Sequence, residues 1–167
     1  EEAQPFYVNA PFGLILAHNG NLTNAPALRD EMFYRDRRHI NTNSDTEVLL
    51  NVLADELQRA TDSIALDAAS AFTAVTKVQK RLKGSYAVVA LIAGYGLLAF
   101  RDPFGIRPLC IGRMDTPNGP EWLIASESVT LEGLGFKFVR DVAPGEAIFI
   151  GLDGQFQSKL CSENATL

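Results

Sequence analysis

The sequence predicts an α+β fold in which two helices pack on one side of mainly antiparallel sheets. Residues 44–57 and 66–82 repeat apolar side chains every three or four positions, which is typical of amphipathic helices. Residues 86–93 and 97–101 are nearly continuous apolar runs joined by a glycine-rich turn, which indicates a β-hairpin covered on both faces. Because strands precede and follow the helices, we expect two stacked sheets inside helical layers.

Two short buried strands are expected at the start of the chain. They cover residues 6–8 and 14–18, and the second is expected to end at Asn19-Gly20-Asn21. Asn24 then has the side chain of a helix cap, so a helix is predicted over residues 26–33.

The first long helix has a recognisable start. Ser44 and Glu47 have the spacing of a capping box, in which each side chain accepts a hydrogen bond from a free N–H group of the helix start. Apolar residues then follow one face, and Asp55, Glu56 and Arg59 are expected to remain in contact with water.

The rest of the chain is predicted to be mostly strands. Turn-forming residues separate five further candidates, which cover residues 109–112, 121–125, 136–139, 147–150 and 155–160. Since the sequence contains no repeat, low-complexity segment or linker, residues 1–167 are expected to form a single domain.

Composition excludes several classes of partner. The formal net charge is −5, which argues against binding to a nucleic acid backbone. No apolar run approaches the roughly 20 residues that cross a bilayer, and the first residues do not resemble a signal peptide. We therefore expect a cytoplasmic protein that binds neither nucleic acid nor membrane.

Asn19 and Gly20 are the first candidates for chemistry. A side-chain amide and an adjacent glycine N–H can both donate to one developing negative oxygen, which is the arrangement of an oxyanion hole. The alternative is that Asn-Gly forms an ordinary tight turn.

Asp45 is the second candidate because it lies in the first turn of a predicted helix. The partial positive charge of a helix start keeps such a carboxylate ionised, and it can bind a substrate ammonium. The alternative is simple stabilisation of the helix start, and proximity to Asn19 decides between the two.

Other polar residues are expected to be structural. Residues 101–109 place two arginines, an aspartate and two prolines around a glycine, which indicates a rigid turn with internal charge pairing. His18 and His39 lack a neighbouring nucleophile, and Cys110 and Cys161 fit neither a zinc site nor a disulfide framework.

Four segments, in matching order and spacing, resemble the class II glutamine amidotransferases. They are residues 2–6 (EAQPF), 17–24 (AHNGNLTN), 39–47 (HINTNSDTE) and 101–109 (RDPFGIRPL). Residues 125–128 (ASES) and 140–147 (RDVAPGEA) extend the similarity. Within that superfamily the combination looks most like the amidophosphoribosyltransferases, which are glycosyltransferases that commit phosphoribosyl pyrophosphate to purine synthesis.

The resemblance implies a fold and a site. The fold is that of the N-terminal-nucleophile hydrolases, with four layers αββα. The substrate is L-glutamine, the oxyanion hole is formed by the Asn19 side-chain amide and the Gly20 N–H, and Asp45 holds the α-ammonium of glutamine.

The resemblance also implies that part of the site lies elsewhere. The family's nucleophile is an N-terminal cysteine whose α-amino group, with a pKa of about 8, acts as the base for the thiol. This sequence opens on Glu1, so we expect a partial domain that lacks the nucleophile and the first strands and is inactive alone. The arginine that binds the glutamine carboxylate is also expected upstream.

The same resemblance implies partners. A separate phosphoribosyltransferase domain would use the ammonia and bind magnesium with phosphoribosyl pyrophosphate, while this domain has no cofactor, and the parent enzyme is expected to be a homo-oligomer. Two alternatives remain, which are the glutaminase domain of another class II enzyme such as asparagine synthetase, and a non-catalytic glutamine-binding or scaffold module.

Overall fold

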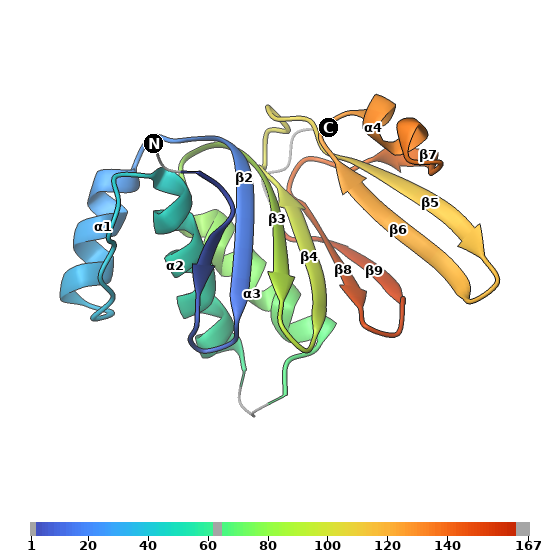
Figure 1. Ribbon diagram of the computed structural model, residues 1–167. Coiled ribbons are helices and arrows are strands. Elements are labelled where there is room, and N and C mark those ends of the chain that lie inside the picture. Colours follow the sequence, from blue (N-terminus) through green and yellow to red (C-terminus); the bar gives the residue numbers. More distant parts are fainter. Residues whose placement is uncertain (1–2, 62–64, 163–167) are drawn as a thin grey trace.

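The strands of the protein form two antiparallel sheets (Figure 1). The computed structural model describes residues 3–61 and 65–162, so Glu1 and Glu2 lie outside the described residues. Within these ranges six strands form one sheet in the order β1-β2-β3-β4-β8-β9, and three form a second in the order β6-β5-β7. The predicted α+β class with stacked antiparallel sheets is confirmed.

The strand boundaries extend several of the predicted segments. The larger sheet contains β1 (Phe6–Val8), β2 (Leu14–Leu22), β3 (Gly84–Ile92), β4 (Gly96–Arg101), β8 (Glu146–Gly151) and β9 (Phe156–Leu160). The smaller sheet contains β5 (Cys110–Thr116), β6 (Gly119–Ala125) and β7 (Lys137–Asp141).

Two of the three long helices, α2 (Asp45–Ala60) and α3 (Ala68–Arg81), lie on one face of the larger sheet, and α1 (Ala25–Tyr34) packs beside α2, as Figure 1 shows. Side chains alternate along a strand, so Leu14 and Leu16 of β2 point to this face and join one core with Val48, Leu49 and Val75 of the helices. This core fixes α2 against β2.

Asn24 does not cap α1 through its side chain, contrary to the prediction. Its amide donates to the Arg81 carbonyl at 2.9 Å, and its side-chain oxygen accepts from the Lys83 N–H at 3.0 Å. The side chain therefore ties the start of α1 to the connection between α3 and β3, whose backbone groups need partners.

The opposite face of the larger sheet meets the smaller sheet. Ala99 and Ile148 from the larger sheet pack with Ile111 and Val142 in this second core. A short helix, α4 (Ser128–Gly133), covers the smaller sheet through the fully buried Leu131. The prediction missed α4 because six residues are too few to show a helical period.

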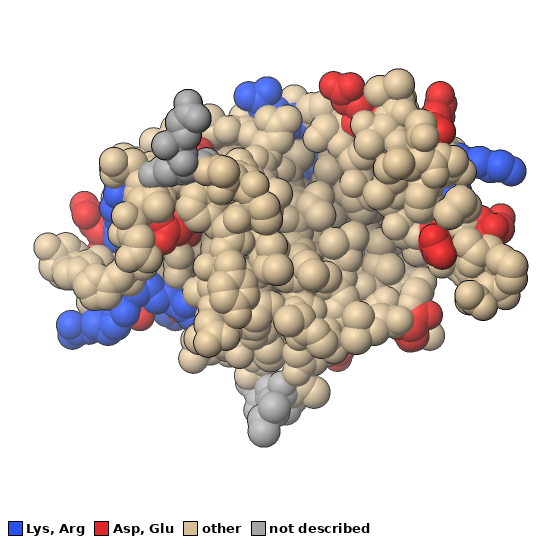
Figure 2. All heavy atoms as spheres, in the orientation of Figure 1, with Lys and Arg blue, Asp and Glu red and all other residues tan. Residues whose placement is uncertain are grey.

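Part of that opposite face is not covered by the smaller sheet. Tyr7, Ile15 and Leu91 lie directly opposite one another on β1, β2 and β3, and are 60%, 38% and 47% exposed. Figure 2 shows few charged side chains over the middle of the molecule in this orientation. The two sheets therefore overlap only partly. The apolar surface formed by Tyr7, Ile15 and Leu91 is left uncovered across β1, β2 and β3.

An arginine on α3 holds the three long helices together. Arg81 contacts Asp55 at 2.9 Å and Glu56 at 2.7 Å on α2, and it also pairs with Glu31 and Asp36. Burial alone would lower the pKa of Arg81, but its hydrogen bonds to Glu56 and Asp55 outweigh that effect and raise it.

The expectation that Asp55 and Glu56 contact water is therefore wrong. They are only 7% and 8% exposed, because α2 is packed on more than one side and Arg81 compensates their charges. The Arg59 side chain, at 52% exposure, does remain in contact with solvent.

Replacing Arg81 with methionine should destabilise the protein strongly. The change leaves the buried Glu56 without its ion-pair partner and removes one of two arginines from the buried Asp55, so the free energy of unfolding is expected to fall by about 3 kcal/mol. Lys80→Met, at an exposed position of the same helix, is the matched control and should change it by less than about 0.5 kcal/mol. Urea unfolding followed by circular dichroism measures both, and equal losses would contradict the assigned role.

Candidate functional site

Asn19 and Gly20 lie within β2, not beyond its end. The ladder between β2 and β3 runs from Leu14 opposite Ile92 to Leu22 opposite Gly84, and Gly20 is opposite Tyr86. The predicted strand end at Asn19 is therefore wrong, and so is the alternative that Asn-Gly forms a tight turn. Long-range pairing with β3 overrides the local preference of this dipeptide for turns.

Gly20 is required by the close approach of β3. Its φ is +147°, and a Cβ at this position would lie 2.0 Å from the Ser85 carbonyl oxygen. A side chain would therefore push the two strands apart. The glycine keeps its backbone tightly paired beside Asn19.

The Asn19 side chain lies on the exposed face of β2. Alternation along the strand directs Leu16 and His18 to the helices, and Ala17 and Asn19 to the other side. Asn19 borders an open cavity of about 240 Å³ between the two sheets, also lined by Ala17, His18, Ala87, Val89, Leu109, Ile124, Ala125 and Ser126. A small molecule can therefore reach the amide.

Asp45 lies at the same end of β2. It is the first residue of α2, and its Oδ2 accepts a hydrogen bond from the Leu22 N–H at 2.9 Å. Leu22 is three residues along the strand from Asn19, which corresponds to about 10 Å. The structure thus places Asn19, Gly20 and Asp45 at one end of one strand, and Asp45 remains partly exposed.

A buried glutamate fixes the loop that leads into Asp45. Glu47 accepts hydrogen bonds from the N–H groups of Asn41 and Thr42 at 2.9 and 2.7 Å, and from their side chains. Burial alone would raise the pKa of Glu47, but these hydrogen bonds outweigh it and lower the pKa.

The predicted capping box is half confirmed. The Ser44 hydroxyl accepts from the Thr46 N–H at 3.2 Å, as a cap should. Glu47 instead accepts hydrogen bonds from the N–H groups of residues 41 and 42, and so provides partners for backbone groups of an irregular loop.

His18 lies behind the candidate site, on the helix side of β2. Its Nδ1 is 2.9 Å from the Thr46 Oγ1, and the Gln4 side chain pairs with its backbone N–H and carbonyl at 2.6 and 2.9 Å. Burial lowers the pKa of His18; Asp45 opposes this effect and Arg107 adds to it. The ring is therefore neutral at pH 7.

No role is predicted for Gln4 and Thr46 from the sequence, although both fall in the segments that carry the family resemblance. The other histidine, His39, is exposed and contacts the Phe33 ring edge-to-face at 5.1 Å. Only one of the two histidines therefore adjoins the candidate site.

The turn over residues 101–109 connects the two sheets. Asp102 is fully buried and accepts hydrogen bonds from the N–H groups of Phe104 and Ile106, while Arg101 donates to the carbonyls of Gly105 and Val142. The predicted charge pairing is wrong, because both side chains serve backbone groups of the turn. The structural role expected for this segment fits these contacts.

Neither cysteine has the surroundings of a nucleophile. Cys110 and Cys161 are buried, and burial raises the pKa of each thiol. The Cys110 Sγ donates to the Ala125 carbonyl, and the Cys161 Sγ to the Phe72 carbonyl. Both thiols are therefore small parts of the core.

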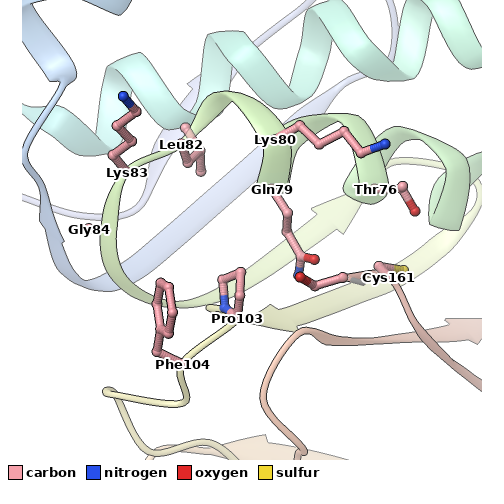
Figure 3. A pocket seen from close by; sticks show the side chains of 10 residues that line it. Thr76, Gln79, Lys80, Leu82, Lys83, Gly84, Pro103, Phe104 and Cys161 are labelled. Atoms are coloured by element: carbon pink, nitrogen blue, oxygen red, sulfur yellow. The ribbon is translucent and has the colours of Figure 1, made fainter. Parts of the chain in front are cut away.

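A larger cavity, of about 400 Å³, lies away from the candidate site (Figure 3). It is formed by the end of α3, the connection to β3, and the residues Pro103, Phe104 and Cys161. Asn19, Gly20 and Asp45 do not line it. Cavity size alone therefore does not locate the site here.

Residues 3–61 and 65–162 show neither a metal-binding cluster nor a membrane-spanning helix. These residues contain no group of three or more His, Cys, Asp or Glu side chains placed to hold a metal ion. They also contain no helix long and apolar enough to cross a membrane.

Comparisons with known proteins agree on one family. The family described as "Glutamine amidotransferase domain" matches residues 1–133. Amidophosphoribosyltransferases of Escherichia coli strain K12 and Schizosaccharomyces pombe are each 54% identical, over 98% and 89% of this chain and 32% and 28% of their own length. The chain thus spans about a third of the curated relatives it matches.

A solved structure gives the same result. The glutamine phosphoribosylpyrophosphate amidotransferase from B. subtilis superposes with a TM-score of 0.76 and 30% identity, covering 97% of this chain and 32% of that one. This similarity confirms the predicted N-terminal-nucleophile fold.

Replacing Gly20 with alanine tests the close approach of the strands. We expect the free energy of unfolding to fall by about 3 kcal/mol, because the new Cβ must displace the Ser85 carbonyl. Gly119→Ala is the control, since Gly119 also has a positive φ but open space around it, and it should cost about 1 kcal/mol. Similar losses for both variants would disprove the steric argument.

Replacing Glu47 with glutamine should destabilise the loop before Asp45 in a pH-dependent way. The lowered pKa of Glu47 stabilises the fold above about pH 4.3, its unfolded value, and this contribution is lost as the pH falls through the folded pKa. Glu47→Gln should therefore cost about 2 kcal/mol at pH 7 and less at pH 3.

Urea titrations between pH 3 and pH 7 measure this difference. The exposed Glu132→Gln on α4 is the control and should show little difference at any pH. A Glu47→Gln effect that does not shrink in acid would refute the assignment.

Proposed function

The chain belongs to the glutamine amidotransferase family, and from this premise we propose that it is the glutamine-hydrolysing part of an amidophosphoribosyltransferase. Ammonia released here would replace the pyrophosphate of phosphoribosyl pyrophosphate and give phosphoribosylamine, which begins purine synthesis. The observation that carries the proposal is the placement of Asn19, Gly20 and Asp45 at one end of β2. The names of the relatives support it.

Asn19 and Gly20 would stabilise the transition state. Attack on the side-chain amide of glutamine moves negative charge onto its oxygen, and two fixed donors facing that oxygen lower the barrier. This role suits the exposed Asn19 amide, which a substrate can reach, and the Gly20 backbone, which close pairing with β3 holds in place.

Asp45 would hold the other end of the substrate. One of its oxygens is fixed by Leu22, which orients the carboxylate, and the start of α2 favours a negative charge at this position. A partly exposed carboxylate there would bind the α-ammonium of glutamine through a charge-assisted hydrogen bond.

The nucleophile in this proposal is a cysteine thiol outside the described residues. The thiol would attack the amide carbon, pass its proton to the departing nitrogen and form a thioester as ammonia leaves. Water would then hydrolyse the thioester to glutamate and restore the thiol. The uncovered surface of Tyr7, Ile15 and Leu91, which runs across β1, β2 and β3, offers room for the segment that carries it.

The remaining parts of the proposal concern the complete enzyme. A separate phosphoribosyltransferase domain would consume the ammonia and bind magnesium with phosphoribosyl pyrophosphate, and this domain would need no cofactor. The complete enzyme would be a cytoplasmic homo-oligomer.

A second candidate is a non-catalytic glutamine-binding module. It is favoured by one observation, which is that both cysteines of the chain are buried and engaged with backbone carbonyls. Glutamine-dependent formation of phosphoribosylamine by the complete enzyme would exclude it, and its absence would refute the first proposal.

Replacing Asn19 with alanine in the complete enzyme should reduce catalysis more than binding. Loss of one oxyanion donor is expected to lower kcat for glutamine roughly 10²- to 10³-fold. Synthesis from free ammonia bypasses this site and should remain unchanged, which makes it the internal control. A normal kcat in Asn19→Ala would remove Asn19 from the oxyanion hole.

Replacing Asp45 with asparagine should mainly weaken binding. Loss of the charge-assisted bond to the ammonium is expected to raise the KM for glutamine roughly 10- to 100-fold. Steady-state kinetics at saturating phosphoribosyl pyrophosphate measures this change. An unchanged KM would show that Asp45 only stabilises the helix start.

A further inference from the structure

A buried hydrogen bond joins the two elements that carry the proposed site. His18 directly precedes Asn19 on β2, and Thr46 directly follows Asp45 on α2. The His18 Nδ1 and the Thr46 Oγ1 are 2.9 Å apart, and the two residues are only 7% and 1% exposed. A change in this contact would therefore move Asn19 and Asp45 relative to each other.

Each partner of this bond is itself fixed. Gln4 holds the backbone of His18 from the neighbouring chain segment through two hydrogen bonds. Thr46 lies in the first turn of α2, where its N–H donates to the Ser44 side chain. The bond thus joins two rigid supports, and it is not a contact between mobile side chains.

Packing alone does not explain why the polar pair of His18 and Thr46 lies between the sheet and α2. Leu16, two residues before His18, and Val48, two residues after Thr46, both belong to the apolar core between the sheet and α2. An apolar pair could fill this space without the cost of burying polar groups. The polar pair adds a defined distance and direction, which apolar contacts do not provide.

We propose that His18 is a positioning residue for glutamine, acting through Thr46 to set the spacing between the Asn19–Gly20 donors and the Asp45 carboxylate. This inference rests on the proposed function of those three residues. His18 does not touch the substrate in this account, because its ring lies on the helix side of β2 while Asn19 lies on the other.

The charge of His18 suits this role. The groups that act on it are Asp45, which favours the protonated ring, and Arg107, which opposes it, and burial keeps the ring neutral by lowering its pKa. A positively charged ring next to Asp45 would compete with the ammonium of glutamine for the carboxylate. The neutral ring keeps its contact with Thr46 and leaves the charge of Asp45 for the substrate.

Thr46→Val and Thr46→Ser in the complete enzyme test the proposal. Valine keeps the shape of threonine and removes the hydroxyl, so the KM for glutamine should rise about tenfold, the effect of one buried hydrogen bond. Serine keeps the hydroxyl and should restore a KM within about twofold of wild type. Ammonia-dependent synthesis should be the same in all three proteins.

Two further variants separate positioning from stability. Thr76→Val on α3 removes a partly buried hydroxyl that donates to the Phe72 carbonyl of its own helix, away from the site, and it should leave the KM unchanged. His18→Leu combined with Thr46→Val should raise the KM no more than His18→Leu alone, because both changes break the same bond.

Two measurements decide the proposal. They are the KM values of these variants and the Kd for glutamine, which isothermal titration calorimetry measures. A normal KM in Thr46→Val, or an equal defect in Thr46→Ser, overturns it. If the wild-type enzyme binds glutamine but does not hydrolyse it, the proposed function fails and the Kd of Thr46→Val, expected to be about tenfold higher, decides the positioning role. If it neither binds nor hydrolyses glutamine, both proposals are wrong.

Discussion

The close pairing of β2 with β3 at Gly20 determines the geometry of the site. The strands approach so closely that the Ser85 carbonyl occupies the space of a side chain. This pairing keeps β2 regular through Asn19, and regular alternation then sends the Asn19 amide to one face and the His18 ring to the other. Two hydrogen bonds then join β2 to the start of α2, one between His18 and Thr46 and one from the Leu22 N–H to Asp45. The position of Asp45 therefore also depends on this strand.

The sequence indicated the site residues through local chemistry, but it could not define their surroundings. Asn-Gly suggested both an oxyanion hole and a turn, and only the partner strand, distant in sequence, decides that no turn forms. Asp55 and Glu56 are predicted to contact water, because the apolar period of α2 identifies only one buried face. It gives no sign that α3 packs against the polar side of α2 and supplies Arg81 as their partner. The helices, the central hairpin and the strand candidates were predictable, since periods of 3.6 and 2 residues are local signals.

The two sheets contribute different parts of the candidate site. The larger sheet carries Asn19 and Gly20 and binds the helices, while the smaller sheet forms the far wall of the cavity next to Asn19 through residues 124–126. The turn containing Asp102 joins the two sheets and ends at Leu109, which lines the same cavity. In the proposed reaction the described residues would supply groups for an oxyanion and an ammonium, while the thiol would come from outside them.

A crystal structure of the complete enzyme with glutamine or an unreactive analogue bound tests this account most directly. The account predicts that the side-chain carbonyl oxygen lies within about 3 Å of the Asn19 Nδ2 and the Gly20 nitrogen, with the α-ammonium on the Asp45 carboxylate. A ligand seated elsewhere, for example in the cavity beside Gln79 and Phe104, would contradict it.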